Sequence, residues 1–234
     1  MADFLTTSFL IAVGQIILID ILLGGDNAVV IALACRNLPA EQRKWGIIWG
    51  TAGAIVLRVI LIMFALTLLT IPYLKLVGAI LLIWIGIKLL LPEEEDPHGA
   101  ITASDKLWGA VKTVIIADLV MSVDNVLAIA GAAQGAGQHQ TALVIFGLLV
   151  SIPIIIGGSQ IVLKLMERYP LIITAGGLLL GWIAGQMAYT DPGVSPYLPY
   201  GKVGEYVTAL LGAALVFFGG RYFAQRAARK AAAS

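Results

Sequence analysis

Long apolar runs alternate with short polar breaks along the whole chain. A membrane-spanning helix requires about 20 predominantly apolar residues, and seven runs reach that length. They cover residues 8–35, 45–70, 72–91, 107–133, 140–163, 170–190 and 203–223. The longest polar break, 92–106, is rich in charge and turn-forming residues and predicts a loop. The pattern therefore predicts an all-α polytopic membrane protein with seven transmembrane helices in one domain, 1–234.

Composition supports lipid as the surrounding solvent. Hydrophobic residues make up 59% of the chain and charged residues 12%, whereas soluble domains carry about 25% charged residues. The single cysteine, Cys35, leaves no partner for an intrachain disulfide. A net charge of +1 offers no electrostatic basis for nucleic-acid binding. The first eight residues lack Lys and Arg, so the first run predicts a retained helix rather than a secretory signal.

Basic residues divide unevenly between the two sides of the predicted bundle. If every run crosses the membrane, twelve Lys and Arg residues fall on one side, only Lys75 and Lys202 fall on the other, and Arg58 lies inside the second run. Cytoplasmic loops are enriched in Lys and Arg. We therefore expect the N-terminus outside, the C-terminus inside and the acidic loop 92–106 in the cytoplasm. The predicted location is the bacterial cytoplasmic (inner) membrane.

One motif, Asp followed by five residues and then Asp-Asn, occurs twice with an offset of 98 residues. Its members are Asp20, Asp26 and Asn27 in the first run and Asp118, Asp124 and Asn125 in the fourth. Three runs separate the copies, and an odd number of crossings inverts the second copy. The sequence thus predicts two inverted three-helix repeats, 8–91 and 107–190, with 203–223 as a seventh helix. Many transporters use this arrangement to form a site near the membrane midplane.

Carboxylates inside a membrane need a reason, because each costs about 2.5–3.5 kcal/mol near the bilayer centre. Gly24 and Gly25 precede Asp26, and Ser122 lies two residues before Asp124. Glycine tolerates non-helical backbone and serine can bond freed carbonyls. We therefore expect local unwinding that turns carboxylate, amide and carbonyl oxygens towards one point. Such hard donors, without His or Cys, suit Mn²⁺, Mg²⁺ or Ca²⁺; the alternative is that these residues only join helices by hydrogen bonds.

Arg58 is a further intramembrane charge, for which we expect a structural role as counter-ion to one of the Asp residues or a role in gating or proton coupling. With all four Asp ionised and Arg58 nearby, the empty site would carry a formal charge of −3. We therefore expect the empty site to hold protons that metal binding releases. This would permit exchange of metal for protons.

Two features predict helix packing. Gly177, Gly181 and Gly185 recur every four residues, which is typical of close helix contact. Pro153 predicts a kink in the fifth helix. The chain contains no phosphate-binding P-loop and no Ser/His/Asp arrangement that indicates catalysis, so neither an ATP-driven pump nor an enzyme is expected.

The stretches "GGDNAVVIALACRNLP" and "ADLVMSVDNVLAIAGAA" resemble the TerC family of integral membrane proteins, in particular its shorter bacterial YjbE-like branch, and the resemblance covers nearly the whole chain. It implies a link to manganese export and metal homeostasis, and a distant relation to LysE-type exporters. It also implies that the two Asp-Asn motifs handle the ion. Manganese as the ion comes from the resemblance; the residues themselves indicate only a hard divalent cation.

Three functional hypotheses follow. The first is a secondary transporter that exports a divalent cation, with Mn²⁺ as cargo and no resident cofactor. The second is a LysE-like exporter of a small organic cation or amino acid. The third is a membrane partner protein that helps to metallate exported proteins. Membrane lipid and the metal ion are the expected partners, and a homo-oligomer or a secretion-machinery partner is left open by the sequence.

Overall fold

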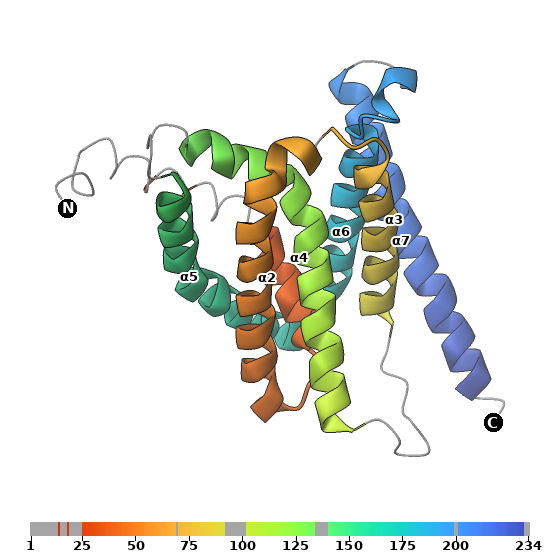
Figure 1. The fold of residues 1–234 in the computed structure, drawn as a ribbon. Coiled ribbons are helices and arrows are strands. Elements are labelled where there is room, and N and C mark those ends of the chain that lie inside the picture. Colours follow the sequence, from red (N-terminus) through yellow and green to blue (C-terminus); the bar gives the residue numbers. More distant parts are fainter. Residues whose placement is uncertain are drawn as a thin grey trace.

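The computed structural model describes Gly14, Leu18 and residues 25–68, 70–91, 102–133, 140–198 and 201–231, with the side chains at 63, 65–68, 103, 124–133, 140–144 and 230–231 outside the description. Helices account for nearly all of this part of the chain (Figure 1). They are Gly25–Cys35, α2 (Ala40–Leu68), α3 (Leu74–Leu90), α4 (Ala103–Ala133), α5 (Gln140–Arg168), α6 (Leu171–Tyr189), the short 3₁₀ helix η3 (Ser195–Tyr197) and α7 (Lys202–Ala231). The all-α prediction is confirmed.

The helices begin and end close to the predicted apolar runs, but several extend into the polar breaks. The start of α4 shows why. The Thr102 backbone N–H donates to Asp105, and the Asp105 backbone N–H donates to the Thr102 hydroxyl, which is a reciprocal capping box. The Thr102 hydroxyl also donates to the Asp105 carboxylate, and these hydrogen bonds hold the pKa of Asp105 below its ordinary value. The last residues of the predicted loop 92–106 therefore belong to α4.

Four helices within the described part are long and apolar enough to cross a membrane: α2, α5, α6 and α7. The described part of the first helix, Gly25–Cys35, is a shorter apolar segment. Two further α-helices also fall outside the set: α3, which has 17 residues, and α4, which carries charged side chains. A multi-pass membrane protein is thus supported, whereas the count of seven spans, the orientation and the inverted repeat stay predictions.

Successive helices run in alternate directions, so the bundle has two distinct ends (Figure 1). At one end the Arg36 side chain donates to the Leu91 carbonyl after α3, and Arg43 on α2 forms an ion pair with Glu167 on α5. We call it the basic end, because the sequence places Lys and Arg mainly in its connections. At the opposite end, Gln186 on α6 donates to Glu205 on α7. The spatial grouping of the basic residues agrees with their predicted grouping by side.

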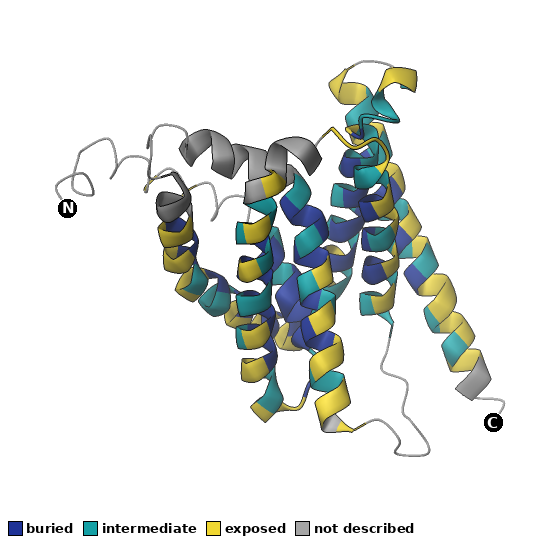
Figure 2. Ribbon diagram, viewed as in Figure 1, coloured by how far each residue is buried: buried dark blue, intermediate teal, exposed yellow. Residues whose placement is uncertain are grey.

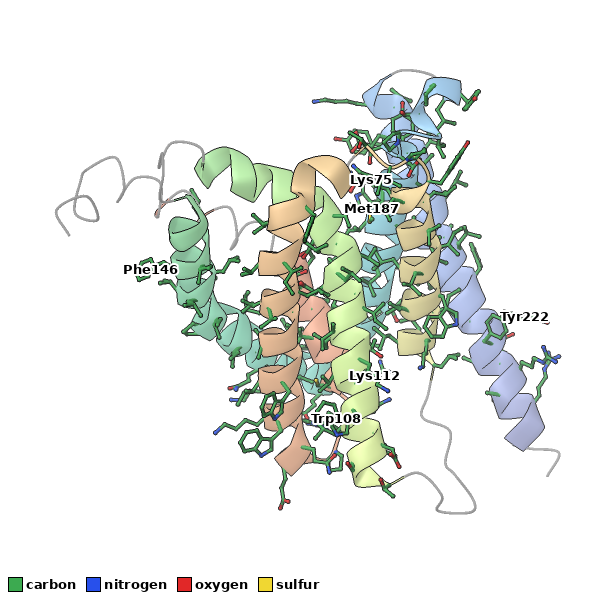
Figure 3. All side chains as sticks on the ribbon, in the orientation of Figure 1. Lys75, Trp108, Lys112, Phe146, Met187 and Tyr222 are labelled. Atoms are coloured by element: carbon green, nitrogen blue, oxygen red, sulfur yellow. The ribbon has the colours of Figure 1, made fainter. Side chains whose placement is uncertain are left out.

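Exposed positions follow the outer faces of the helices (Figure 2), and many of them are large apolar residues. Phe146 on α5 and Tyr222 on α7 point outwards from the bundle (Figure 3). Trp45 and Trp108 are exposed near the basic end, where α2 and α4 begin. Trp and Tyr are enriched where transmembrane helices meet the headgroup region, so this surface suits lipid.

Close glycine contacts join α6 to α7. A Cβ at Gly181 would lie 2.4 Å from the Gly212 carbonyl oxygen, and one at Gly185 would lie 2.1 Å from the Thr208 carbonyl oxygen. At both positions backbone therefore meets backbone, as the spacing of these glycines predicts. Gly177 has a different neighbour, the Leu90 side chain of α3, from which a Cβ would lie 2.7 Å.

Helix α5 contains Pro153 and bends along its length (Figure 1). Proline removes one backbone donor and its ring crowds the preceding turn. The Ser151 hydroxyl donates to the Gly147 carbonyl within the same region of the helix, and such back-bonding favours bending. The predicted kink is therefore present.

A buried carboxylate at the opposite end connects α6 to α3. Asp191, directly after α6, accepts backbone hydrogen bonds from Tyr73 at 2.9 Å, from Leu76 at 3.1 Å and from Gly193 at 2.7 Å. Burial by itself raises the pKa of Asp191, but these bonds and one from the Lys75 backbone together hold it below its ordinary value. Asp191 thus caps α3 from a distant part of the chain and fixes how the two helices meet.

Candidate functional site

The buried ion pair at the centre of the bundle joins Arg58 on α2 to Asp118 on α4. Its Nη2–Oδ1 distance is 2.5 Å, and the two residues are 2% and 6% exposed. Asp118 is the midpoint of α4, so the pair lies about halfway along the helices rather than at an end. One partner without the other would leave an uncompensated charge in apolar surroundings. Of the two roles expected for Arg58, the structure supports counter-ion.

Ser122 completes this cluster one helical turn after Asp118. The Arg58 Nε–H donates to the Ser122 hydroxyl oxygen at 3.1 Å, and the Ser122 hydroxyl donates to Asp118 Oδ2 at 3.1 Å. Both carboxylate oxygens of Asp118 therefore have a donor. We call Arg58, Asp118 and Ser122 the arginine cluster.

The prediction that the helix unwinds near Ser122 is wrong. Helix α4 continues without interruption from Ala103 to Ala133, so no backbone carbonyl is freed there for Ser122 to bond. Its hydroxyl instead bonds the side chains of Asp118 and Arg58. Gly25 also lies within helix, whereas Gly24 is outside the described residues.

Asp26 and Asn27 belong to the first described helix, Gly25–Cys35. The Asp26 carboxylate is half-buried and accepts a hydrogen bond from the Asn27 backbone N–H at 2.8 Å. Arg58 and Asp118 both act on it electrostatically. Asp26, in the first motif copy, therefore lies close enough to Asp118, the first Asp of the second copy, for their charges to interact, although the two are 92 residues apart.

The Asn27 side chain is buried and has no hydrogen-bond partner in the described part of the chain. It is 3% exposed, and neither its Nδ2 nor its Oδ1 is bonded. A buried polar group left unpaired costs about 1–3 kcal/mol, so native structures rarely keep one without cause. Thr51, seven residues before Arg58 on α2, also has an unbonded buried hydroxyl.

The remaining predicted ligands are not described. Asp20 lies outside the described residues, and so do the side chains of Asp124 and Asn125, although their backbone is part of α4. In the described part of the chain, no three His, Cys, Asp or Glu side chains gather as metal ligands. The site of four carboxylates therefore stays a prediction. The structure describes two of its four acids, Asp26 and Asp118.

Sequence reasoning missed the role of Asp191. The "DPG" sequence signals a turn, but it does not indicate that the carboxylate caps a helix more than one hundred residues earlier. Sequence reasoning also left open which acid Arg58 pairs with. Both contacts depend on how helices meet.

Comparisons with known proteins agree with the membrane architecture. Residues 5–230 match the family described as Integral membrane protein TerC family. The chain belongs to this family.

The chain is similar to several bacterial membrane proteins. It is 41% identical to the uncharacterized membrane protein YjbE of Bacillus subtilis over 93% of this chain and 97% of that protein. It is 30% identical to YceF of the same organism, over 75% of this chain and 70% of the relative. It is 26% identical to the UPF0053 inner membrane protein YgdQ of Escherichia coli, over 68% and 72%. No solved structure matches the chain significantly.

Proposed function

We propose that this protein is a secondary transporter of the bacterial inner membrane that exports a hard divalent cation, with Mn²⁺ as its cargo. The observation that carries the proposal is the buried Arg58–Asp118 ion pair, which includes the first Asp of the second Asp-Asn motif and lies near enough to Asp26 of the first motif for both charges to act on its carboxylate. Two motif copies that approach each other inside a bundle match the use that transporters make of inverted repeats. Manganese, rather than another hard cation, comes from the family resemblance.

Asn27 adds a second reason to expect a ligand. Its side-chain amide is buried, unbonded and directly next to Asp26. An amide oxygen and a carboxylate are the donor types that Mn²⁺ and Mg²⁺ prefer. A bound cation would give the Asn27 oxygen the partner that it lacks among the described residues.

The arginine cluster limits how readily the Asp118 carboxylate can bind a cation. Asp118 is fully engaged by Arg58 and Ser122, so a cation that uses this carboxylate has to displace the guanidinium. We propose that Arg58 neutralises Asp118 while no cation is bound. Asp26, which forms no ion pair with any described residue, is then the acid more readily offered to the cation.

Packing is compatible with the proposed inverted repeat. Helix α2 packs along α4, and Gly158 on α5 lies against Ala28 of the first helix, since a Cβ added at Gly158 would lie 3.6 Å from the Ala28 Cβ. In a repeat of three helices these two contacts are equivalent, because the first helix corresponds to α4 and α2 to α5. The membrane orientation that we propose puts the basic end in the cytoplasm.

The arginine cluster disfavours an amino-acid substrate. A zwitterion needs a cationic partner for its carboxylate, and Arg58, the basic residue within the second predicted span, is committed to Asp118. We therefore favour a metal ion over a LysE-like organic solute.

Flux measurements with purified protein in proteoliposomes test the proposal. We expect Mn²⁺ uptake into vesicles of suitable orientation, no uptake of lysine or arginine, and acceleration by a pH gradient, since the metal is proposed to exchange for protons. If the flux is unchanged between about pH 5 and 8, the protein transports the metal without exchanging it for protons. A protein that binds Mn²⁺ but moves no ion under any gradient would instead fit a partner in metallation.

A further inference from the structure

Thr51 on α2 carries a buried hydroxyl that has no hydrogen-bond partner in the described part of the chain. The residue is 2% exposed, and its Oγ1 is unbonded. A helical serine or threonine can satisfy its hydroxyl by donating to the carbonyl four residues earlier. Four hydroxyls of this protein form that bond, those of Thr113, Ser151, Ser159 and Thr208. The Thr51 hydroxyl does not, and native structures rarely leave a buried hydroxyl unpaired without cause.

Thr51 shares a face of α2 with Arg58. The two are seven residues apart, close to two helical turns and about 10.5 Å along the axis. Trp45 and Trp49 are exposed on the opposite face, whereas Arg58 turns inwards to Asp118. Thr51 therefore points into the bundle on the side of the arginine cluster. Because α2 begins at the basic end, Thr51 is the nearer of the two to that end.

Asn27, the other residue near the arginine cluster with unbonded buried atoms, lies at a similar depth in the first helix. A Cβ at Gly46 would lie 3.0 Å from Cys35 Sγ, so these two residues align α2 with the first helix, which runs in the opposite direction (Figure 1). Thr51 is five residues from Gly46 and Asn27 is eight from Cys35, about 7.5 Å and about 12 Å on the same side of this contact. The two unbonded groups therefore differ in depth by less than one helical turn.

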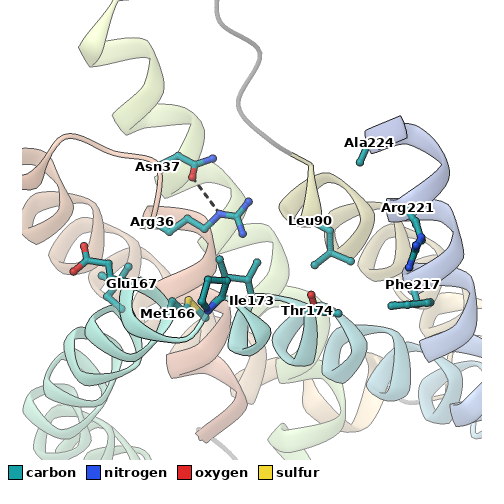
Figure 4. A pocket seen from close by; sticks show the side chains of 13 residues that line it. Arg36, Asn37, Leu90, Met166, Glu167, Ile173, Thr174, Phe217, Arg221 and Ala224 are labelled. Carbon is teal, nitrogen blue, oxygen red and sulfur yellow. Dashed lines mark hydrogen bonds between the residues drawn. The ribbon is translucent and has the colours of Figure 1, made fainter. Parts of the chain in front are cut away.

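A cavity of about 640 Å³ lies at the basic end, between the ends of several helices (Figure 4). Leu163 of α5 lines it and is five residues along the helix from Gly158, which lies against Ala28, next to Asn27. Along α5 the cavity therefore stops about 7.5 Å short of this level. Neither Thr51 nor Asn27 lines it. An ion that moves between the basic end and the arginine cluster has to pass the level of these two residues.

We infer that Thr51 is a further residue of the ion path, where its hydroxyl oxygen and the amide oxygen of Asn27 receive the cation on the basic-end side of the arginine cluster. This inference rests on the proposed transport of a hard divalent cation and extends it to a residue outside the Asp-Asn motifs. Both groups are hard oxygen donors without charge. They attract a dication less strongly than carboxylates do, which suits a position that an ion must leave as well as enter.

Thr51→Val tests the inference, because valine keeps the shape of threonine and removes the oxygen. In proteoliposomes we expect the Mn²⁺ concentration for half-maximal flux to rise about tenfold, the lower end of what the loss of a side chain around a metal costs. The unfolding temperature in detergent should rise by about 2–4 °C, since the variant no longer buries an unpaired hydroxyl. Weaker transport together with higher stability is not expected of a residue that serves only packing.

Matched variants separate the oxygen from the shape of the side chain. Thr51→Ser keeps the hydroxyl and should transport Mn²⁺ with an affinity close to that of the wild type. Thr113→Val makes the same change on α4, where the hydroxyl already donates to the Gly109 carbonyl, and should leave the Mn²⁺ affinity unchanged. Thr51→Cys replaces a hard donor with a soft one. Its flux should be inhibited by Cd²⁺ at about one tenth of the concentration that the wild type requires, and Thr113→Cys should not show this change.

Binding of Mn²⁺ to the purified protein, followed by the paramagnetic resonance signal of the free ion, separates this inference from the proposed function. If Asp26→Asn stops transport and Thr51→Val leaves the Mn²⁺ affinity unchanged, the inference is wrong and the proposed function stands. Equal losses in Thr51→Val and Thr51→Ser would assign the effect to packing and also overturn the inference. If the wild type binds Mn²⁺ without moving it, transport is wrong, and tenfold weaker binding by Thr51→Val would support Thr51 as a ligand. If the wild type neither binds nor moves Mn²⁺, both proposals are wrong.

Discussion

Arg58 and Asp118, which are 60 residues apart in the sequence, form an ion pair with an N–O distance of 2.5 Å inside the helix bundle. Each residue is almost fully buried. Because neither charge has water to solvate it, each depends on the other for its stability in this position. The pair is therefore both a structural link between α2 and α4 and a constraint on how Asp118 can take part in ion binding.

Removal of one partner of this pair should destabilise the protein strongly. We expect Asp118→Ala and Arg58→Ala each to lower the free energy of unfolding by about 3–5 kcal/mol, because each leaves a buried charge uncompensated. The double variant Arg58→Met/Asp118→Leu should lose less than either single variant. Thermal unfolding in detergent measures the effect, and Glu167→Gln, which breaks the more exposed pair with Arg43, is the control, with an expected loss of about 0–1 kcal/mol. Additive losses in the double variant would contradict a coupled pair.

Neutralising the second acid of each motif should stop transport without unfolding the protein. Asp26→Asn and Asp124→Asn keep the side-chain shape but remove the charge that a hard dication requires. We expect each to reduce Mn²⁺ flux in proteoliposomes more than tenfold, the equivalent of at least about 1.4 kcal/mol, with normal expression and insertion. Asp105→Asn removes an exposed acid at the start of α4 and should transport normally. Full flux in either motif variant would exclude that residue as a ligand.

Asp191 should stabilise the protein at neutral pH. Asp191→Asn replaces a carboxylate that accepts several backbone N–H groups with an amide that can accept less strongly, at a cost of about 1.5–3 kcal/mol. Since the folded pKa of Asp191 is lowered, its contribution is complete above the pKa of the unfolded chain, about 3.9, and disappears as the pH falls through the folded pKa. Unfolding temperatures recorded at several pH values should therefore differ between wild type and variant at about pH 5–8 and converge below about pH 4. A difference that grows towards acid pH would refute this role.

The α6–α7 contact should not tolerate a methyl group. In Gly181→Ala the new Cβ would lie 2.4 Å from the Gly212 carbonyl oxygen, so the two helices have to separate, and we expect a loss of about 1–3 kcal/mol from overpacking. Gly157→Ala is the matched control, since a Cβ there meets nothing within 4 Å. In a helix that substitution should be neutral or stabilise by up to about 1 kcal/mol. Unfolding in detergent distinguishes the two variants. Equal changes in stability would mean that the close contact with α7 is not the reason why position 181 requires glycine.

The sequence by itself determined the helical architecture of this protein. In lipid the backbone must satisfy its own hydrogen bonds, so long apolar runs become helices wherever breaks allow, and α2 to α7 lie close to the predicted runs. Local signals were equally informative: the bend at Pro153 and the glycine contacts at Gly181 and Gly185 depend on single residues or on small side chains that permit close approach. The family could be recognised for the same reason, because its Asp-Asn motifs are local.

Only the tertiary structure decided which charges meet. Helical periodicity places Arg58 on a face of α2 but does not identify the acid opposite it, and the pairing with Asp118 follows from how α2 packs along α4. The sequence also did not show that α4 continues through Ser122. The Ser122 hydroxyl forms hydrogen bonds with the side chains of Asp118 and Arg58, and the helix stays intact there. The capping of α3 by Asp191 is a further example. Side-chain pairing across helices depends on rotation and approach of whole elements, and these are set by the packing of many residues at once rather than by any local pattern.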